Sequence, residues 1–174
     1  VLRLFSVLLG GGVVGLAFLI SRTIFPHSQA LAYGTMAFVA FVPMHTAMMA
    51  SVNNDVLAEL IIAVTLFLLV RRLRRRERPS LQSDLLLGLF LGLGLLTKFT
   101  VYVLVLPLTA LTLWWGRHGQ ERLAWARSAA VVFGLALFLV LPWYSRNAVL
   151  YGGLDILGLA RHDQVVVGQP RTAD

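Results

Sequence analysis

Long apolar blocks alternate with short polar stretches along the whole chain. Six segments are dominated by apolar or small residues, namely 4–20, 30–49, 56–70, 85–96, 101–115 and 130–141. A helix of roughly 20 residues crosses a hydrocarbon layer about 30 Å thick, and these blocks approach that length together with their flanks. The pattern predicts an all-α fold, a polytopic transmembrane helical bundle of about six membrane segments.

The segment 30–49 is less regular than the others because Pro43 and His45 interrupt its apolar run. Proline lacks a backbone N–H donor and breaks or kinks a helix. We therefore expect residues 30–49 to cross the membrane irregularly or to re-enter it from one side.

Gly88 and Gly92 are four residues apart in the segment 85–96 and fall on one helix face. Small residues let membrane helices approach each other closely. We interpret this pair as a packing seam rather than as part of a ligand site.

The composition excludes a soluble globular domain. Hydrophobic residues make up 58% of the chain and charged residues 13%, whereas ordinary soluble domains contain roughly 45–50% and about 25%. The absence of cysteine excludes disulfides, thiol catalysis and cysteine-based metal sites in this sequence. Since the chain starts inside an apolar block at Val1, we expect a fragment, in which 1–150 is a transmembrane region and 151–174 an exoplasmic loop or tail.

Two basic connections define the expected orientation in the membrane. Their arginines are Arg71, Arg72, Arg74, Arg75, Arg76 and Arg78 in the first, and Arg117, Arg122 and Arg127 in the second. The positive-inside rule predicts that both connections are cytoplasmic. The segments 85–96 and 101–115 lie between them, so the turn around Lys98 is expected on the exoplasmic face.

The net charge of +7 does not indicate a nucleic-acid partner. The basic cluster directly flanks a membrane segment, where topology and anionic lipid headgroups explain it. No aromatic residues are interleaved with it to stack on bases. We expect the lipid bilayer as a partner, and no nucleic acid.

Polar side chains from four segments are expected at the exoplasmic level. The candidates for the site are His45, Asn54, Asp55, Glu59, Lys98, Tyr144, Arg146 and Asn147, with Asn53 and Trp143 beside them. Ionisable groups in a membrane are costly and usually face a polar cavity. Acids, cations and amides at one level therefore predict a site for an anionic headgroup.

Simpler explanations stay open for the acidic residues. The side chain of Asn54 or Asp55 is suited to cap the helix expected from Val56. Glu59 lies one turn deeper on the same face as Asp55, where the helix dipole and interfacial solvation favour a carboxylate. The same spacing also permits the two carboxylates to share a proton or a metal ion.

Similar alternatives apply to the basic residues. The long stem of Lys98 can let its ammonium reach the headgroup region. Arg146 follows Trp143 and Tyr144, as an interfacial anchor in an aromatic belt does. A guanidinium is nevertheless the side chain best shaped to bind phosphate. His45 is a single histidine close to Pro43, and a structural role is the alternative to a role in the site.

Three motifs, in order along the chain, carry a resemblance to a known family. They are PMHTAMMASVNND at 43–55, LGLFLGLGLLTK at 87–98, and PWYSRN at 142–147 followed by YGG at 151–153. This order resembles the polytopic glycosyltransferases of the C superfamily, in particular the bacterial protein O-mannosyltransferase and aminoarabinose transferase group, over about residues 20–155. Nucleotide-binding glycine loops, zinc helix motifs and nucleophile elbows do not occur in the sequence.

The resemblance implies an enzyme of the bacterial inner membrane that transfers a sugar from a polyprenyl-phosphate carrier to an unidentified acceptor on the exoplasmic side. It implies a main catalytic base upstream of Val1 and a second acidic position at Asp55. Asp55 would hold the acceptor, the carrier phosphate or a divalent cation such as Mg²⁺ or Mn²⁺, which prefer oxygen ligands. Lys98 and Arg146 match basic positions near the phosphate.

Two functions without catalysis are the alternatives. A transporter is favoured by broken helices that meet at the membrane midplane, whereas the polar groups here are expected at one face. A purely structural membrane subunit is the other alternative.

Overall fold

The computed structural model of the chain describes residues 2–51, 54–75, 80–116, 121–152 and 155–165. All regular structure in this part of the chain is helical, which confirms the predicted all-α fold class. Parts of the motifs, basic connections and expected tail lie outside the described residues, among them Val52, Asn53, Arg76, Arg78, Arg117, Gly153 and the range 166–174.

The first three helices form a layer in which α1 packs against α2 and α3. Their bounds are Leu2–Ile24 for α1, Gln29–Phe41 for α2 and Pro43–Ala50 for α3. Between α2 and α3 the chain bends by 58°. Proline is well suited to the first helical position of α3 because it has no N–H to leave unpaired there. The bend at Pro43 confirms the irregular path predicted for residues 30–49.

The remaining helices form the larger part of the bundle. They are α4 (Asp55–Arg75), α5 (Leu81–Leu95), the π-helical turn η1 (Val101–Val105), α6 (Leu106–Gly116), α7 (Arg122–Tyr151) and α8 (Leu159–Val165). Because α4 continues to Arg75, the first part of the basic connection from Arg71 is helical rather than a loop.

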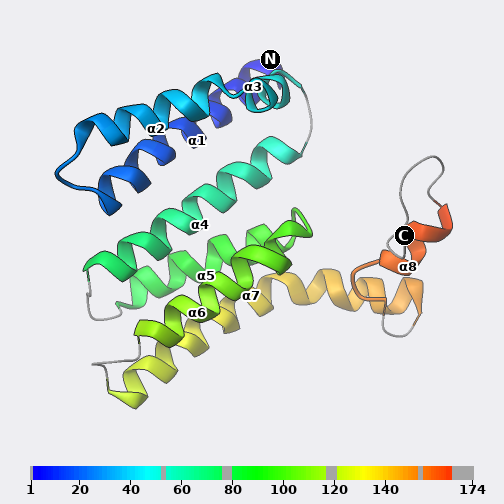
Figure 1. The fold of residues 1–174 in the computed structure, drawn as a ribbon. Helices are drawn as coiled ribbons and strands as arrows, with labels where there is room; N and C mark the ends of the chain where they lie inside the picture. The colour runs from blue at the N-terminus through cyan, green and yellow to red at the C-terminus, as the bar shows by residue number, and fades with distance from the viewer. Residues whose placement is uncertain (1, 52–53, 76–79, 117–120, 153–154, 166–174) are drawn as a thin grey trace.

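The helices run back and forth between two ends of the bundle (Figure 1). One end, called the arginine end, contains the last turns of α1, α4 and α6 and the first turns of α2, α5 and α7. The other end, called the Lys98 end, contains the first turn of α4 and the turn between α5 and η1. Lys98 and the basic connections thus lie at different ends of the described structure, as the sequence predicted.

Two of the described helices, α1 and α7, are long and apolar enough to cross a membrane, and α2 with α3 makes a third if the bent pair is one span. This is fewer than the six segments expected. The difference has a physical cause, since α5 and the helical stretch Val101–Gly116 are apolar but short. The fourth helix is long enough, but acidic residues at its start and arginines at its end reduce its apolar length.

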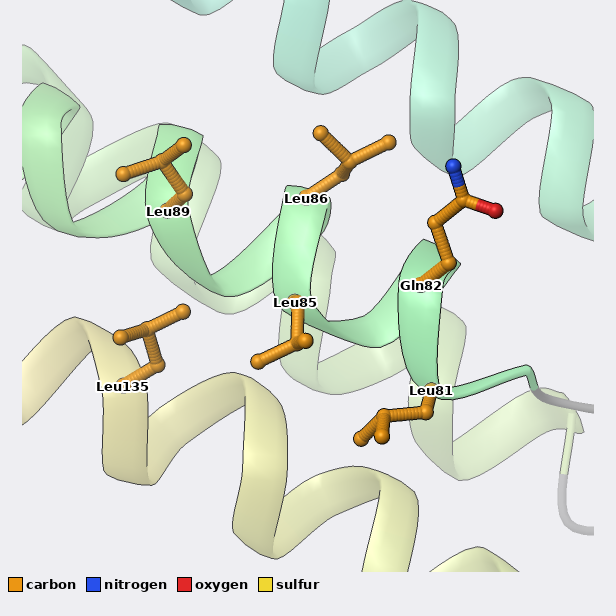
Figure 2. Close-up of a pocket in the computed structure, with 6 residues that line it drawn as sticks. All are labelled: Leu81, Gln82, Leu85, Leu86, Leu89 and Leu135. Atoms are coloured by element: carbon orange, nitrogen blue, oxygen red, sulfur yellow. The ribbon is translucent and has the colours of Figure 1, made fainter.

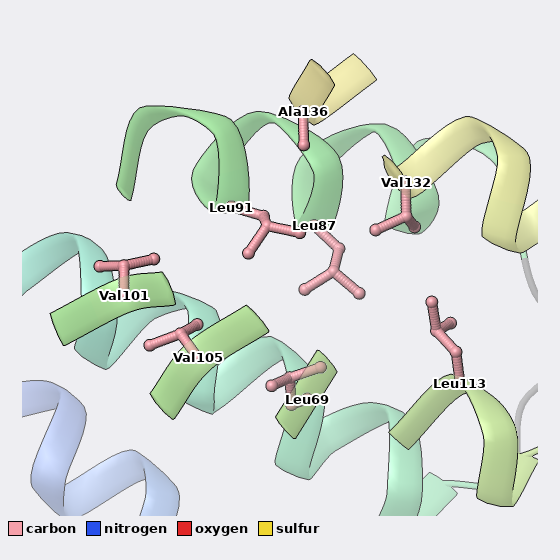
Figure 3. Packing of buried hydrophobic residues seen from close by; sticks show 8 residues of the cluster. All are labelled: Leu69, Leu87, Leu91, Val101, Val105, Leu113, Val132 and Ala136. Atoms are coloured by element: carbon pink, nitrogen blue, oxygen red, sulfur yellow. The ribbon is translucent and has the colours of Figure 1, made fainter. Parts of the chain in front are cut away.

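The core of the bundle lies between α4, α5, η1, α6 and α7 (Figure 3). It consists of Leu69, Leu87, Leu91, Val101, Val105, Leu113, Val132 and Ala136, each at most 3% exposed. These apolar side chains fix the rotation of α4, α5 and α7 about their axes. That rotation decides which polar side chains meet at each end.

The contact between α5 and α7 depends on two glycines. A Cβ atom at Gly88 would lie 2.7 Å from the carbonyl oxygen of Val132, and one at Gly92 would lie 3.1 Å from Cα of Ala136. Both approaches are to backbone, which cannot rotate away as a side chain can. The structure therefore confirms the predicted packing seam on this face of α5.

Candidate functional site

Two carboxylates at the start of α4 each meet a basic side chain from another part of the bundle. The ammonium Nζ of Lys98 lies 2.6 Å from Oδ1 of Asp55. One turn along α4, Oε1 of Glu59 lies 3.1 Å from Nδ1 of His45 in α3. Four of the residues selected from the sequence are therefore joined in two pairs along one helix.

The pair of Asp55 and Lys98 is only partly covered by protein. Their side chains are 32% and 41% exposed, respectively. An ammonium has three N–H donors, and within the described residues Lys98 uses one of them, on Asp55. Lys98 can therefore donate to an anionic ligand while it stays bound to Asp55.

The turn that carries Lys98 follows from how α5 ends. The carbonyl oxygen of Gly94 accepts hydrogen bonds from the backbone N–H of Thr97 at 3.0 Å and of Lys98 at 3.3 Å. The hydroxyl of Thr97 donates to the same oxygen at 2.8 Å. These bonds satisfy a carbonyl that would otherwise be unpaired at the helix end. They turn the chain at the level of the first residue of α4, where Asp55 lies.

Asn54 and Asp55 contribute different hydrogen bonds at the start of α4, and the capping role considered for their side chains stays a prediction. The contribution of Asn54 is its backbone oxygen, which accepts from the N–H of Ala58 at 3.1 Å. The carboxylate of Asp55 accepts a hydrogen bond from Lys98, 43 residues further along the chain.

A pair of tyrosines lies beside this turn. The hydroxyl groups of Tyr102 in η1 and Tyr144 in α7 are 2.6 Å apart, and the Tyr102 hydroxyl donates to the carbonyl oxygen of Leu95 at 2.7 Å. Tyr144 was a candidate from the sequence, and Tyr102 was missed. The available signal was that Tyr102 follows Lys98 by four residues, which is also what an ordinary aromatic residue in an apolar helix looks like.

Arg146 and Asn147 form a separate group further along α7. The Cζ atom of Arg146 lies 5.2 Å from the centre of the Trp143 ring, and its Nη1 donates to Oδ1 of Asn147 at 3.3 Å. The side chain of Asn147 is buried and donates to the carbonyl oxygen of Ile156 at 2.9 Å. Among the described residues, no contact joins Arg146 to the pair of Asp55 and Lys98.

The divalent cation considered at Asp55 from the sequence stays a prediction. Among the described residues, no group of three or more His, Cys, Asp or Glu side chains could hold a metal ion. Asp55 is paired with Lys98, and Glu59 is paired with His45.

A second polar cluster, missed in the sequence, lies at the arginine end. The carboxylate Oδ1 of Asp84 accepts from Nη1 of Arg72 at 2.5 Å and from the hydroxyl of Ser128 at 2.8 Å. Arg72 also donates to the oxygen of Ser128 at 2.6 Å. The three residues belong to α4, α5 and α7, so this cluster joins the three central helices.

An open apolar groove of about 520 Å³ runs along α5 beside α7 (Figure 2). It is lined by Leu81, Gln82, Leu85, Leu86, Leu89 and Leu135. Since Leu81 is the first residue of α5, the groove starts at the arginine end. Its described lining offers no charged group to a sugar phosphate, so we do not include it in the candidate site.

Comparison with known proteins agrees with the resemblance seen in the sequence. A family model described as dolichyl-phosphate-mannose-protein mannosyltransferase matches residues 1–144. Comparisons with curated proteins and with solved structures gave no significant match. The matched range contains both pairs on α4 and both tyrosines, whereas Arg146 and Asn147 fall just beyond it.

Proposed function

Because the chain belongs to the dolichyl-phosphate-mannose-protein mannosyltransferase family, we propose that it is part of a membrane glycosyltransferase with a polyprenyl-phosphate sugar donor. The sugar passes to an acceptor on the exoplasmic side of a bacterial inner membrane. About six crossings fit this proposal, since α4, α5 and the stretch from η1 through α6 lie between the same two ends as α1 and α7.

The observation that carries the proposal is the partly open pair of Asp55 and Lys98, at the end away from the arginines. During transfer, the bond between the anomeric carbon and the phosphate oxygen breaks, and its electron pair stays on the phosphate. A cation fixed beside that oxygen stabilises the developing charge. Lys98 has donors available for this contact, and Asp55 fixes where its ammonium lies.

The acceptor must also lose a proton. Its hydroxyl oxygen forms the new bond to the anomeric carbon while a carboxylate takes the proton. We assign Asp55 to the second acidic position, where it orients Lys98 and the acceptor, and not to the main base. Among the other candidates, His45, Asn54, Glu59 and Tyr144 form the surroundings of the pair. Arg146 and Asn147 belong to the separate group on α7 and are proposed as further substrate contacts.

The test is the variant Asp55→Asn in the full-length enzyme. It keeps the size and a carbonyl oxygen of the side chain but removes the charge that holds Lys98. A partly exposed ion pair contributes only about 0–1 kcal/mol to stability, so expression and the unfolding midpoint should stay near normal. Transfer from a polyprenyl-phosphate sugar should fall at least about tenfold.

Glu121→Gln is the matched control. Glu121 precedes α7 at the arginine end, is exposed, and makes no side-chain cap bond, so this variant removes a carboxylate charge far from the pair. It should transfer at the normal rate. If Asp55→Asn transferred as fast as Glu121→Gln, the proposal would fail. An equal loss of transfer and of folded protein would make the pair structural.

A further inference from the structure

The hydrogen bonds of Tyr102 have a fixed direction. A phenol has one O–H donor, and Tyr102 gives its proton to the carbonyl oxygen of Leu95 at 2.7 Å. The contact of 2.6 Å between the two tyrosine hydroxyls must then have Tyr144 as donor and Tyr102 as acceptor. A chain of two bonds thus runs from α7 through η1 to the end of α5.

These bonds enclose the segment that presents Lys98. Leu95 is the last residue of α5 and Tyr102 is the second residue of η1, so the hydroxyl bond joins the two sides of the turn whose sequence contains Lys98. The ring of Tyr102 also stacks on Phe99, with 5.9 Å between ring centres. The backbone N–H of Tyr102 donates to the backbone oxygen of Phe99 at 2.9 Å. Tyr102 therefore holds the turn through three contacts, namely its backbone N–H, its ring and its hydroxyl.

We propose that Tyr102 is a positioning residue that fixes the turn carrying Lys98, and that Tyr144 anchors this arrangement to α7. The inference rests on the proposed function, in which Lys98 contacts the carrier phosphate. A cation held in place before binding loses less entropy when the phosphate arrives. The π-helical turn is consistent with this role, because such turns are rare and occur frequently at functional sites.

The Tyr102 hydroxyl takes part in both hydrogen bonds and the Tyr144 hydroxyl in only one, so the two tyrosines can be tested separately. Tyr102→Phe keeps the ring and its stacking but removes the bond to Leu95 and the acceptor for Tyr144. Tyr144→Phe removes only the second bond. The affinity of the full-length enzyme for a short-chain polyprenyl phosphate, measured by calorimetry in lipid nanodiscs, should fall by about three- to tenfold for Tyr102→Phe and by less for Tyr144→Phe.

The control is Tyr33→Phe. Tyr33 is exposed on α2, its ring lies tilted against that of Phe18, and its hydroxyl makes no hydrogen bond within the described residues. This variant should bind with normal affinity. Unfolding midpoints measured for all three variants separate a loss of positioning from a loss of folded protein.

The decisive measurement repeats Tyr102→Phe in a Lys98→Gln background. If Tyr102 acts through Lys98, its effect on polyprenyl-phosphate affinity should disappear once Lys98 is gone, as double-mutant cycles report for coupled residues. An equal loss in both backgrounds, or none in either, would overturn the positioning role. If Lys98→Gln alone left the affinity unchanged, the phosphate contact in the proposed function would itself be wrong.

Discussion

The two ends of the bundle use ion pairs in different ways. At the arginine end, Asp84 is 1% exposed and Ser128 is fully buried, and both are bonded to each other and to Arg72. At the Lys98 end, Asp55 and Lys98 are 32% and 41% exposed. The first group is enclosed between helices, whereas the second is open to a ligand.

This difference separates structure from function on physical grounds. A buried charge is tolerated only when its partners are in place, and removing one partner leaves the other uncompensated. The cluster at the arginine end therefore fixes how α4, α5 and α7 pack. A partly exposed pair adds little to stability. Its presence at the Lys98 end is better explained by what it can bind.

The largest expected effect concerns the sides of the membrane. The sequence contains no cysteine, so single cysteines can report each end in a full-length protein whose other cysteines, if it has any, are replaced. Ser80 and Thr100 are both exposed, at the arginine end and the Lys98 end respectively. In intact cells, a membrane-impermeant thiol reagent should label Thr100→Cys and leave Ser80→Cys unlabelled.

Permeabilised cells provide the control for this experiment, since both variants should then react. Labelling of Ser80→Cys in intact cells would place the arginine end outside. The candidate site would then face the cytoplasm, and the comparison of the two ends would lose its functional meaning.

The next effect is on stability. Asp84→Asn leaves the guanidinium of Arg72 beside a neutral amide, and we expect the free energy of unfolding to fall by roughly 2–4 kcal/mol. The loss should stay below the largest values for buried pairs because Arg72 is 17% exposed and its long stem can reach the interface. Denaturation of the purified protein in one fixed detergent measures this change.

Asp55→Asn is the matched variant at the other end, with an expected loss within about 1 kcal/mol. Equal destabilisation by the two variants would show that the two ion pairs are alike. The separation between a structural end and a functional end would then be wrong.

The sequence predicted features that depend on residue type and local spacing. Helical structure, the irregular path at Pro43 and the seam at Gly88 and Gly92 all follow from apolar length, a missing donor or a missing side chain. The crossing count was less well predicted, because some apolar blocks form helices shorter than a membrane span requires, as in α5 and Val101–Gly116.

The partners of the polar residues could not be predicted. Asp55 meets Lys98 from 43 residues away and Arg72 meets Ser128 from 56 residues away. Which side chains meet depends on the rotation of each helix, which the core between α4, α5 and α7 sets. Sequence placed Lys98 and Asp55 at one level of the membrane, but Tyr102 had no polar neighbour in sequence to distinguish it.

The smallest expected effect is at Arg146, which lies outside the two ion-paired groups. Arg146→Lys keeps the charge but loses the planar fork and much of the contact with Trp143. If Arg146 is a second phosphate contact, affinity for a polyprenyl phosphate should fall by about two- to fivefold, less than for Lys98→Gln, since Asp55 holds Lys98 in place while Arg146 is exposed. Titration of the full-length enzyme in lipid nanodiscs measures both variants. Unchanged affinity for Arg146→Lys would make Arg146 an interfacial anchor and confine the phosphate site to the Lys98 end.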